Sequence, residues 1–189
     1  MAEKVTILPP RDPWPFSSVS AEDLQELVDG GMLHPAIPEG HPRWLVPREE
    51  EEPNPPVGYV VSFVSFHERG FGVPPSRFMR ALLYYSGVEL HNFNPNSIAQ
   101  AAIFAAVCEG FLGIDPHWDL WVHLFRAEPF SNLTETKKVR TAVRAGGCTL
   151  QLGADRVHQY IPASLTSSNK GWQSRWFYLR NDDGWLPPY

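Results

Sequence analysis

Hydrophobic residues recur at helical spacing between residues 74 and 125 and predict three consecutive helices. The first begins at Pro74-Pro75-Ser76, runs to Tyr85 and stops at Gly87. The third follows Asp115-Pro116, where Asp115 is the expected cap. The inward stripe is Phe78, Met79, Leu82 and Leu83 in the first helix, and Trp118, Trp121, Val122 and Phe125 in the third.

The middle helix of the three, residues 96–112, is apolar on all its sides. Asn94-Pro95 begins it, as an N-cap followed by Pro at the first helical position. Ile98, Ala102 and Ala105 lie on one side, and Ile103, Ala106 and Val107 lie on another. A helix with this pattern packs against neighbours on every face, so we expect it to be the centre of the fold.

The flanking segments supply further elements. Ser20 predicts an N-capped helix that ends at Gly30. Residues 57–70 combine strand-type β-branched residues with apolar residues at helical spacing, and we favour a helix. In the last third, residues 148–152 and 157–161 predict a hairpin, and residues 175–179 predict another strand.

These elements predict a mainly helical α+β fold. About five helices surround residues 96–112, and a small antiparallel sheet comes from the C-terminal third. Residues 1–56 form a Pro-rich acidic arm with one short helix, in which Trp14, Phe16, Leu24, Leu27 and Trp44 hold the arm to the body. Residues 57–189 form a single globular domain, helical over 57–128 and β-containing and basic over 129–189.

Charge separates along the chain. Residues 1–56 carry 4 Lys and Arg against 11 Asp and Glu, whereas residues 126–180 carry 9 against 3. Glu49 to Glu52 precede several prolines, so residues 46–56 are expected to be protease-sensitive.

The chain has two cysteines, Cys108 and Cys148, which are too few for a structural zinc site.

The chain has no apolar leader at its N-terminus, and its longest apolar run, residues 101–108, is too short to span a membrane. We therefore expect a nuclear or cytoplasmic protein that is not secreted and does not enter a membrane. No nucleophile elbow or phosphate-binding loop is present, and no cofactor is expected.

The best metal candidates are Asp119 and His123, which share a helix face at i,i+4 spacing. Two ligands make an incomplete site, so a solvent-exposed polar face is the favoured interpretation. A magnesium-dependent nuclease would need converging acids, for which Asp115, Asp119 and Glu128 are the only cluster.

The basic last third has the composition of a nucleic-acid surface, in which cations contact phosphates and rings stack on bases. The alternative is that these rings belong to the core. The candidate residues are Lys137, Lys138, Arg140, Arg144, Lys170, Trp172, Arg175, Trp176 and Tyr178.

Several segments carry a resemblance to a known family. These are FHERGFGVPPSRF, ELHNFNPNSIAQ, EGFLGIDPHWDLW, GGCTLQL and NKGWQSRWFYLRN. The chain resembles, over roughly residues 14–184, the gypsy-type transposon domain of plant retroelements, known from grass genomes. The resemblance implies transposable-element ancestry and names no catalytic residue.

Three functions remain open on these grounds. The leading hypothesis is a non-enzymatic interaction module that binds a protein partner or self-associates, because aromatic residues exceed what a few helices need. Nucleic-acid binding by the basic last third is the alternative. A magnesium-dependent nuclease or transposase remnant is the third.

Overall fold

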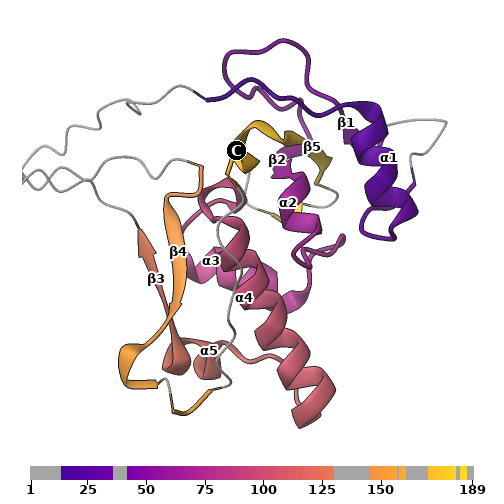
Figure 1. Cartoon of the computed structure of the whole chain (residues 1–189). Helices are drawn as coiled ribbons and strands as arrows, with labels where there is room; N and C mark the ends of the chain where they lie inside the picture. Colours follow the sequence, from indigo (N-terminus) through magenta and orange to yellow (C-terminus); the bar gives the residue numbers. More distant parts are fainter. Residues whose placement is uncertain are drawn as a thin grey trace, which may run out of the picture.

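The computed structural model describes residues 14–35, 42–129, 145–156, 158–160, 170–181 and 184–186. These residues form an α+β fold with five α-helices and two small antiparallel sheets, which confirms the predicted fold class (Figure 1). The α-helices are α1 (Ala21–Asp29), α2 (Val64–His67), α3 (Arg77–Ser86), α4 (Pro95–Ala106) and α5 (Trp118–Leu124). The strands are β1 (Trp44–Leu45), β2 (Tyr59–Phe63), β3 (Phe125–Pro129), β4 (Cys148–Leu152) and β5 (Trp176–Arg180).

The larger sheet has the order β1-β5-β2, so a strand from the C-terminal end lies between two from the N-terminal third. β5 pairs with β2 from Tyr59–Arg180 to Phe63–Trp176. The helix expected over residues 57–70 is therefore wrong in its first half: a strand comes first and the short α2 follows. Four of the five β2 residues are buried, and this burial on both faces suits β-branched and aromatic side chains.

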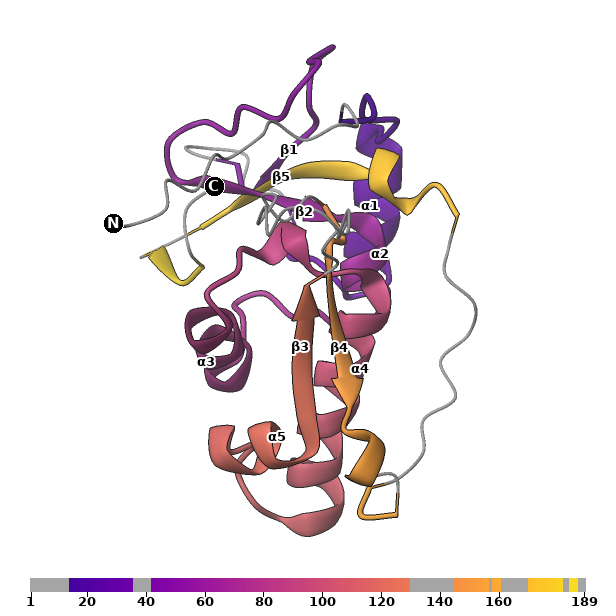
Figure 2. The same ribbon diagram turned by 90° about the vertical axis from the view of Figure 1, so that its left-hand side faces the viewer.

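The smaller sheet pairs β3 with β4, in register from Phe125–Leu152 to Pro129–Cys148. The expected hairpin between residues 148–152 and 157–161 is wrong, because β4 pairs with the strand that follows α5 and residues 158–160 form a turn. Figure 2 shows this ribbon standing along α4. Neither sheet is built from the C-terminal third alone.

α4 begins as predicted, with the Asn94 side chain accepting a hydrogen bond from the Ser97 amide (2.8 Å). A π-helix, η2 (Val107–Leu112), continues it to Gly113. Seven residues between Pro95 and Phe104 are buried, but Ala106 and residues 109–112 are exposed. The expectation that residues 96–112 have no solvent-facing side therefore holds only for the first half of the helix.

Small residues of α4 allow close approach, as the alanine content indicated. Gly70 has a φ of +91°, and a Cβ at this position would lie 2.9 Å from the Cβ of Ala102. The turn after α2 can therefore pack directly on α4. Ser97 joins α4 to β4, since its Oγ accepts from the Leu150 amide (2.9 Å).

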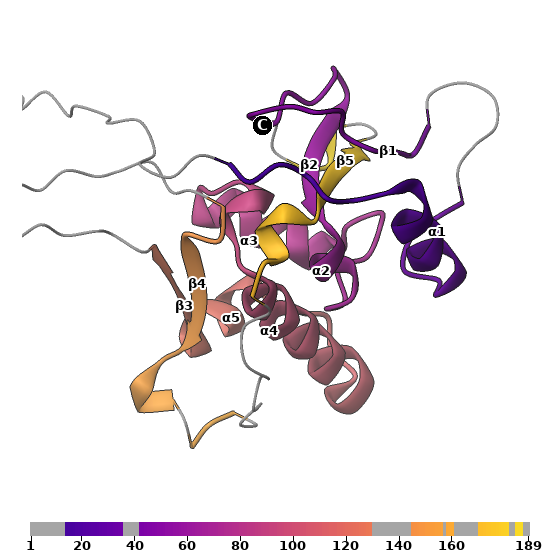
Figure 3. The ribbon, with the colours of Figure 1, turned by 45° about the horizontal axis from the view of Figure 1, so that its top comes forward.

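The N-terminal arm packs on the body through α1 and the segment before it. Ser20 and Asp23 form a capping box, and Leu24 and Leu27 enter the hydrophobic core. Pro15 accepts a hydrogen bond from the Trp176 indole N–H (2.9 Å). Figure 3 shows α1 beside β1 and α2, on the side away from the β3–β4 ribbon.

Of the five residues expected to hold the arm, four contact the core: Leu24 and Leu27 belong to it, and Trp14 and Trp44 pack against it. Phe16 does not, since it is 60% exposed.

The acidic segment also has fixed contacts. The Tyr178 hydroxyl donates to the Glu50 carboxylate and accepts from the Asn54 amide (2.8 Å). In the part of the chain that the structure describes, no helix is long and apolar enough to cross a membrane.

Candidate interaction surface

Two tyrosines at the end of α3 face solvent. Ser76 caps α3, and the buried stripe of α3 agrees with the prediction from the sequence. The stripe orients the helix so that Tyr84 lies outside it. Tyr84 is 78% exposed and Tyr85 is 60% exposed. Tyr85 stacks on Trp118 of α5 (ring centroids 4.7 Å, interplanar angle 23°), which joins the two helices at the surface.

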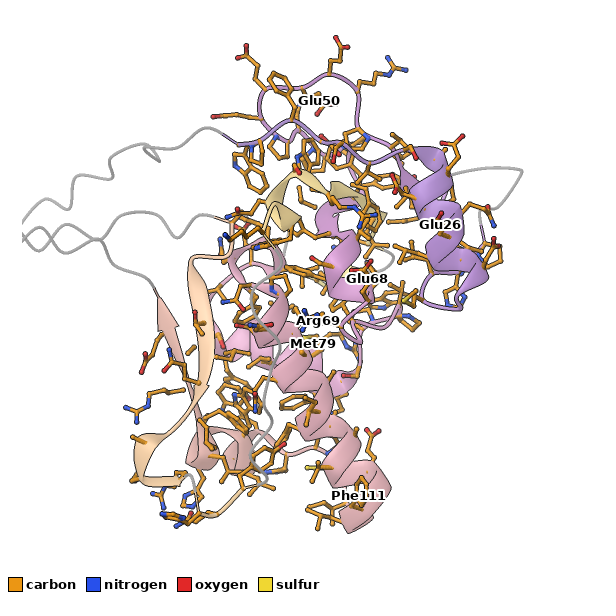
Figure 4. The ribbon with its side chains drawn as sticks, viewed as in Figure 1. Glu26, Glu50, Glu68, Arg69, Met79 and Phe111 are labelled. Atoms are coloured by element: carbon orange, nitrogen blue, oxygen red, sulfur yellow. The ribbon has the colours of Figure 1, made fainter. Side chains whose placement is uncertain are left out.

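A second exposed group lies at the tip of η2. Phe111 is 83% exposed, Leu112 is 58% exposed, and Ile114 follows in the turn toward α5. In Figure 4, Phe111 lies at the far end of the α4–η2 rod, whereas Glu50 lies at the opposite end of the molecule. π-helical turns are frequent at functional sites, and here the turn carries its phenylalanine into solvent.

α5 and the tip of η2 lie at the same end of the molecule in Figures 1 and 2, and the Tyr85–Trp118 stack joins α3 to α5. We call this surface the aromatic end. It consists of Tyr84, Tyr85, Phe111, Leu112, Ile114, Trp118 and Val122. Its three most exposed rings present about 400 Å² by themselves, given roughly 200 Å² for each full ring. Exposed rings of this size supply much of the contact area in protein interfaces.

Charged residues of both signs border the aromatic end. Arg77 and Arg80 are exposed on α3, and helical spacing places both on the same face as Tyr84. Glu109, Asp115 and Asp119 are exposed on the side of η2 and α5. The surface therefore has a basic edge on α3 and an acidic edge on η2 and α5.

The sequence-predicted metal candidates lie on this acidic edge. Asp119 is paired with His117 (Nδ1 to Oδ2, 3.6 Å), and His117 caps α5 in place of the expected Asp115. His123 is exposed. Among the residues that the structure describes, no group of three or more His, Cys, Asp or Glu side chains could hold a metal ion. Glu128 lies beside Arg126 (3.7 Å).

The predicted nucleic-acid residues do not come together on one described surface. Lys137, Lys138, Arg140 and Arg144 lie outside the described residues, and Lys170 is exposed. Trp172, Trp176 and Tyr178 are buried, and each contacts another buried ring. Bases cannot stack on buried rings, so these aromatic residues do not form the expected platform.

Arg175 is engaged within the fold. Its guanidinium contacts the Asp23 carboxylate at 3.0 Å and the Glu68 carboxylate at 3.7 Å. The pair with Asp23 joins β5 to α1, and the Ser20 amide and hydroxyl, together with Arg175, hold the pKa of Asp23 below its usual range. Arg175 therefore ties the arm to the sheet.

A buried Ser62–His67 pair has the residue types of a nucleophile and its base. Ser62 Oγ lies 3.0 Å from His67 Nε2, but Ser62 is fully buried and His67 is 2% exposed. A substrate cannot reach the Ser62 hydroxyl in this arrangement. Burial lowers the pKa of His67 to about 4, so the ring is neutral near pH 7.

This lowered pKa predicts a loss of stability in acid. Between pH 6.5 and about 4 the unfolded chain protonates His67 while the folded chain does not, so the free energy of unfolding falls as pH falls through this window. Thermal melts from about pH 7 to about pH 5 measure the effect. We expect a steep decline in the parent chain and a shallower one in His67→Gln. The control His34→Gln, at an exposed histidine, should lose stability with falling pH as the parent chain does. If His67→Gln also lost stability as steeply as the parent chain, the lowered pKa of His67 would not be the cause.

Sequence reasoning did not single out the aromatic end. Tyr84 lies outside the predicted inward stripe of α3 and shares a helix face with two arginines. This pattern could have indicated that Tyr84 is exposed to solvent. Phe111 was assigned to a helix expected to be buried on all sides, so its exposure could not be foreseen.

Part of the chain matches a known protein family. Residues 60–129 match the model of the family described as "Putative gypsy type transposon". No curated protein and no solved structure matches the chain. The matched segment runs from β2 to β3 and contains the whole aromatic end. Residues 60–129 of this chain are therefore similar to the gypsy-type transposon family.

Proposed function

We propose that this chain is a non-enzymatic interaction module that binds a second copy of itself through the aromatic end. The observation that supports this most is where exposed apolar side chains gather. The structure has nine exposed large hydrophobic residues in its described part, and six of them lie between Tyr84 and Val122. Aromatic residues in such clusters supply most of the energy of protein contacts.

The charge pattern favours a second copy over an unrelated partner. In a two-fold dimer each copy presents the same surface, so the surface must complement itself. Arg77 and Arg80 on one edge can face Asp115 and Asp119 of the other copy, and the two-fold axis repeats the contact. The apolar centre is then enclosed by two sets of opposite charges.

The absence of enzymatic activity is part of the proposal. The acids considered for a nuclease do not support one, because Asp119 pairs with His117 and Glu128 lies beside Arg126. The Ser62–His67 pair is shielded from solvent. Magnesium-dependent cleavage that failed in Asp119→Asn would contradict this part.

Sedimentation velocity over a range of concentrations tests the interaction. The parent chain should show reversible self-association, and Phe111→Ser should weaken it about tenfold or more because a central exposed ring is lost. Phe111 is 83% exposed, so this substitution should leave the thermal melt unchanged.

Val57→Ser is the matched control, since Val57 is fully exposed but lies outside the aromatic end. It should associate like the parent chain. A parent chain that stays monomeric at high concentration, or equal weakening by both substitutions, would refute the proposal.

Nucleic-acid binding is the competing outcome. A filter-binding titration at two salt concentrations would detect it, since phosphate contacts weaken steeply with salt. Salt-sensitive binding that falls in Lys170→Ala would favour this function, whereas the described part of the chain gives no ring platform to support it.

A further inference from the structure

His117 lies where the acidic edge meets the aromatic end, directly before Trp118. Its Nδ1 atom has two neighbours on Asp119, the backbone N–H at 3.2 Å and the carboxylate Oδ2 at 3.6 Å. The side chain of His117 is 68% exposed and that of Asp119 is 83% exposed, so solvent protons reach both groups. One exposed nitrogen atom therefore serves two contacts.

These two contacts of Nδ1 need different protonation states. In a neutral ring Nδ1 can carry no proton, and it then accepts the Asp119 N–H and caps α5. A protonated ring carries a proton on both nitrogens, so Nδ1 can only donate. The cap contact is then lost, and the Asp119 carboxylate is the acceptor beside it. Histidine changes its charge between about pH 8 and about pH 5, where carboxylates stay ionised.

The charged groups around α5 come from the acidic edge, from α3, which packs against α5, and from the strand and turn beyond its C-terminus. They are Glu109, Asp115, Asp119 and His123; Arg77 and Arg80; and the pairs Arg126–Glu128 and Asp155–Arg156. Each of the two pairs is balanced in charge. The three carboxylates of the acidic edge give a net charge of −3 when His117 and His123 are neutral, and −1 when both are protonated.

We propose that protonation of His117 and His123 releases the second copy of the chain from the aromatic end as pH falls. This inference rests on the proposed self-association, in which the arginines of α3 face Asp115 and Asp119 of the other copy. A protonated His117 attracts the Asp119 carboxylate and repels those arginines. Loss of the cap also loosens the first turn of α5, which carries Trp118. Both effects occur twice in a two-fold dimer.

Sedimentation velocity of the intact chain at about pH 7.5 and about pH 6 measures this regulation. We expect the dissociation constant of the parent chain to rise roughly tenfold as pH falls, because exposed ion pairs are lost in both halves of the contact. Circular dichroism at each pH checks that the chain remains folded.

His117→Asn is the most specific variant, since asparagine is a favoured N-cap that does not titrate. It should associate like the parent chain at about pH 7.5 and lose most of the pH dependence. Adding His123→Gln should remove the rest. His34→Asn is the control, because His34 is exposed but lies after α1, outside the aromatic end and its edges. It should dissociate with falling pH as the parent chain does.

Nuclear magnetic resonance of Phe111→Ser separates the change at His117 from self-association, which this variant should weaken. We expect the amide resonance of Asp119 to move together with the titration of the His117 ring, because protonation removes the hydrogen bond from this amide to Nδ1. The same resonance should stay constant when His117→Asn is added.

The outcomes distinguish the regulation from the proposed function. A parent chain that is monomeric at both pH values refutes the self-association and the regulation together. A parent chain that associates equally at both pH values retains the proposed function and overturns the regulation. The regulation is also overturned if the variant with His117→Asn and His123→Gln keeps the parental pH dependence, or if the Asp119 amide does not follow the His117 ring.

Discussion

Replacing Ala101 with Glu is expected to abolish the cooperative unfolding transition of the domain. Ala101 is 1% exposed on the buried half of α4, where β4 and α2 also pack. The larger side chain has no room there, and its carboxylate would lose water without gaining a partner. Together these costs are comparable to the whole stability of a domain, about 5–15 kcal/mol. Circular dichroism melts measure the outcome.

Ala106→Glu is the matched control five residues along the same helix. Ala106 is exposed, and Glu has a good helix propensity, so its melting temperature should remain close to the parent value. If Ala101→Glu melted cooperatively near the parental temperature, the first half of α4 would not be the buried core that the structure shows.

Removing residues 1–56 is expected to leave a chain that does not fold stably. The arm contributes Val19, Leu24, Leu27 and Leu33 to the core, and burying side chains of this kind stabilises by about 1.5–3 kcal/mol each. It also supplies β1, which pairs with β5. The loss is similar to the total stability of a small domain.

Limited proteolysis is the corresponding measurement on the intact chain. Cleavage in the Glu49–Glu52 segment should yield fragments that unfold once separated, because the arm completes the core. A stable, cooperatively melting fragment of residues 57–189 would instead support an independent domain that begins at residue 57.

Local signals predicted those parts of the fold that depend on neighbouring residues. Ser20, Ser76 and Asn94 each cap the helix expected from the sequence, because a cap is a contact within a few residues. The strand expected near residues 175–179 is also present, displaced by one residue as β5.

The pairing of strands that are distant in the sequence could not be predicted from local patterns. β2 pairs with β5 more than a hundred residues away, and nothing in residues 57–66 shows that partner. Its apolar residues fit helical spacing equally well, so periodicity alone could not decide. For the same reason Phe125 was placed in a helix, although it begins a strand whose partner is β4.

The site was harder to predict than the fold, since composition does not separate core rings from surface rings. Trp172 and Trp176 lie close to Lys170 and Arg175, so the sequence left open whether they stack on bases or belong to the core; both are buried. Phe111 looked buried and is exposed. Phe111 is exposed because it lies in η2, the continuation of α4, whereas Trp172 and Trp176 contact other buried rings.

Charge reversal at the edges of the aromatic end tests the central claim of self-association most directly. One variant carries Arg77→Glu and Arg80→Glu, so both of its edges are acidic. The other carries Asp115→Arg and Asp119→Arg, so its edges are largely basic. These positions are exposed, and neither variant should lose stability.

Sedimentation velocity of each variant alone and of their equimolar mixture gives the result. We expect each variant to be monomeric where the parent chain associates, because like charges face each other across the two-fold contact. The mixture should form a heterodimer, since every edge then meets its opposite. Association of either variant as strong as that of the parent, or a mixture that stays monomeric, would contradict a contact through this surface.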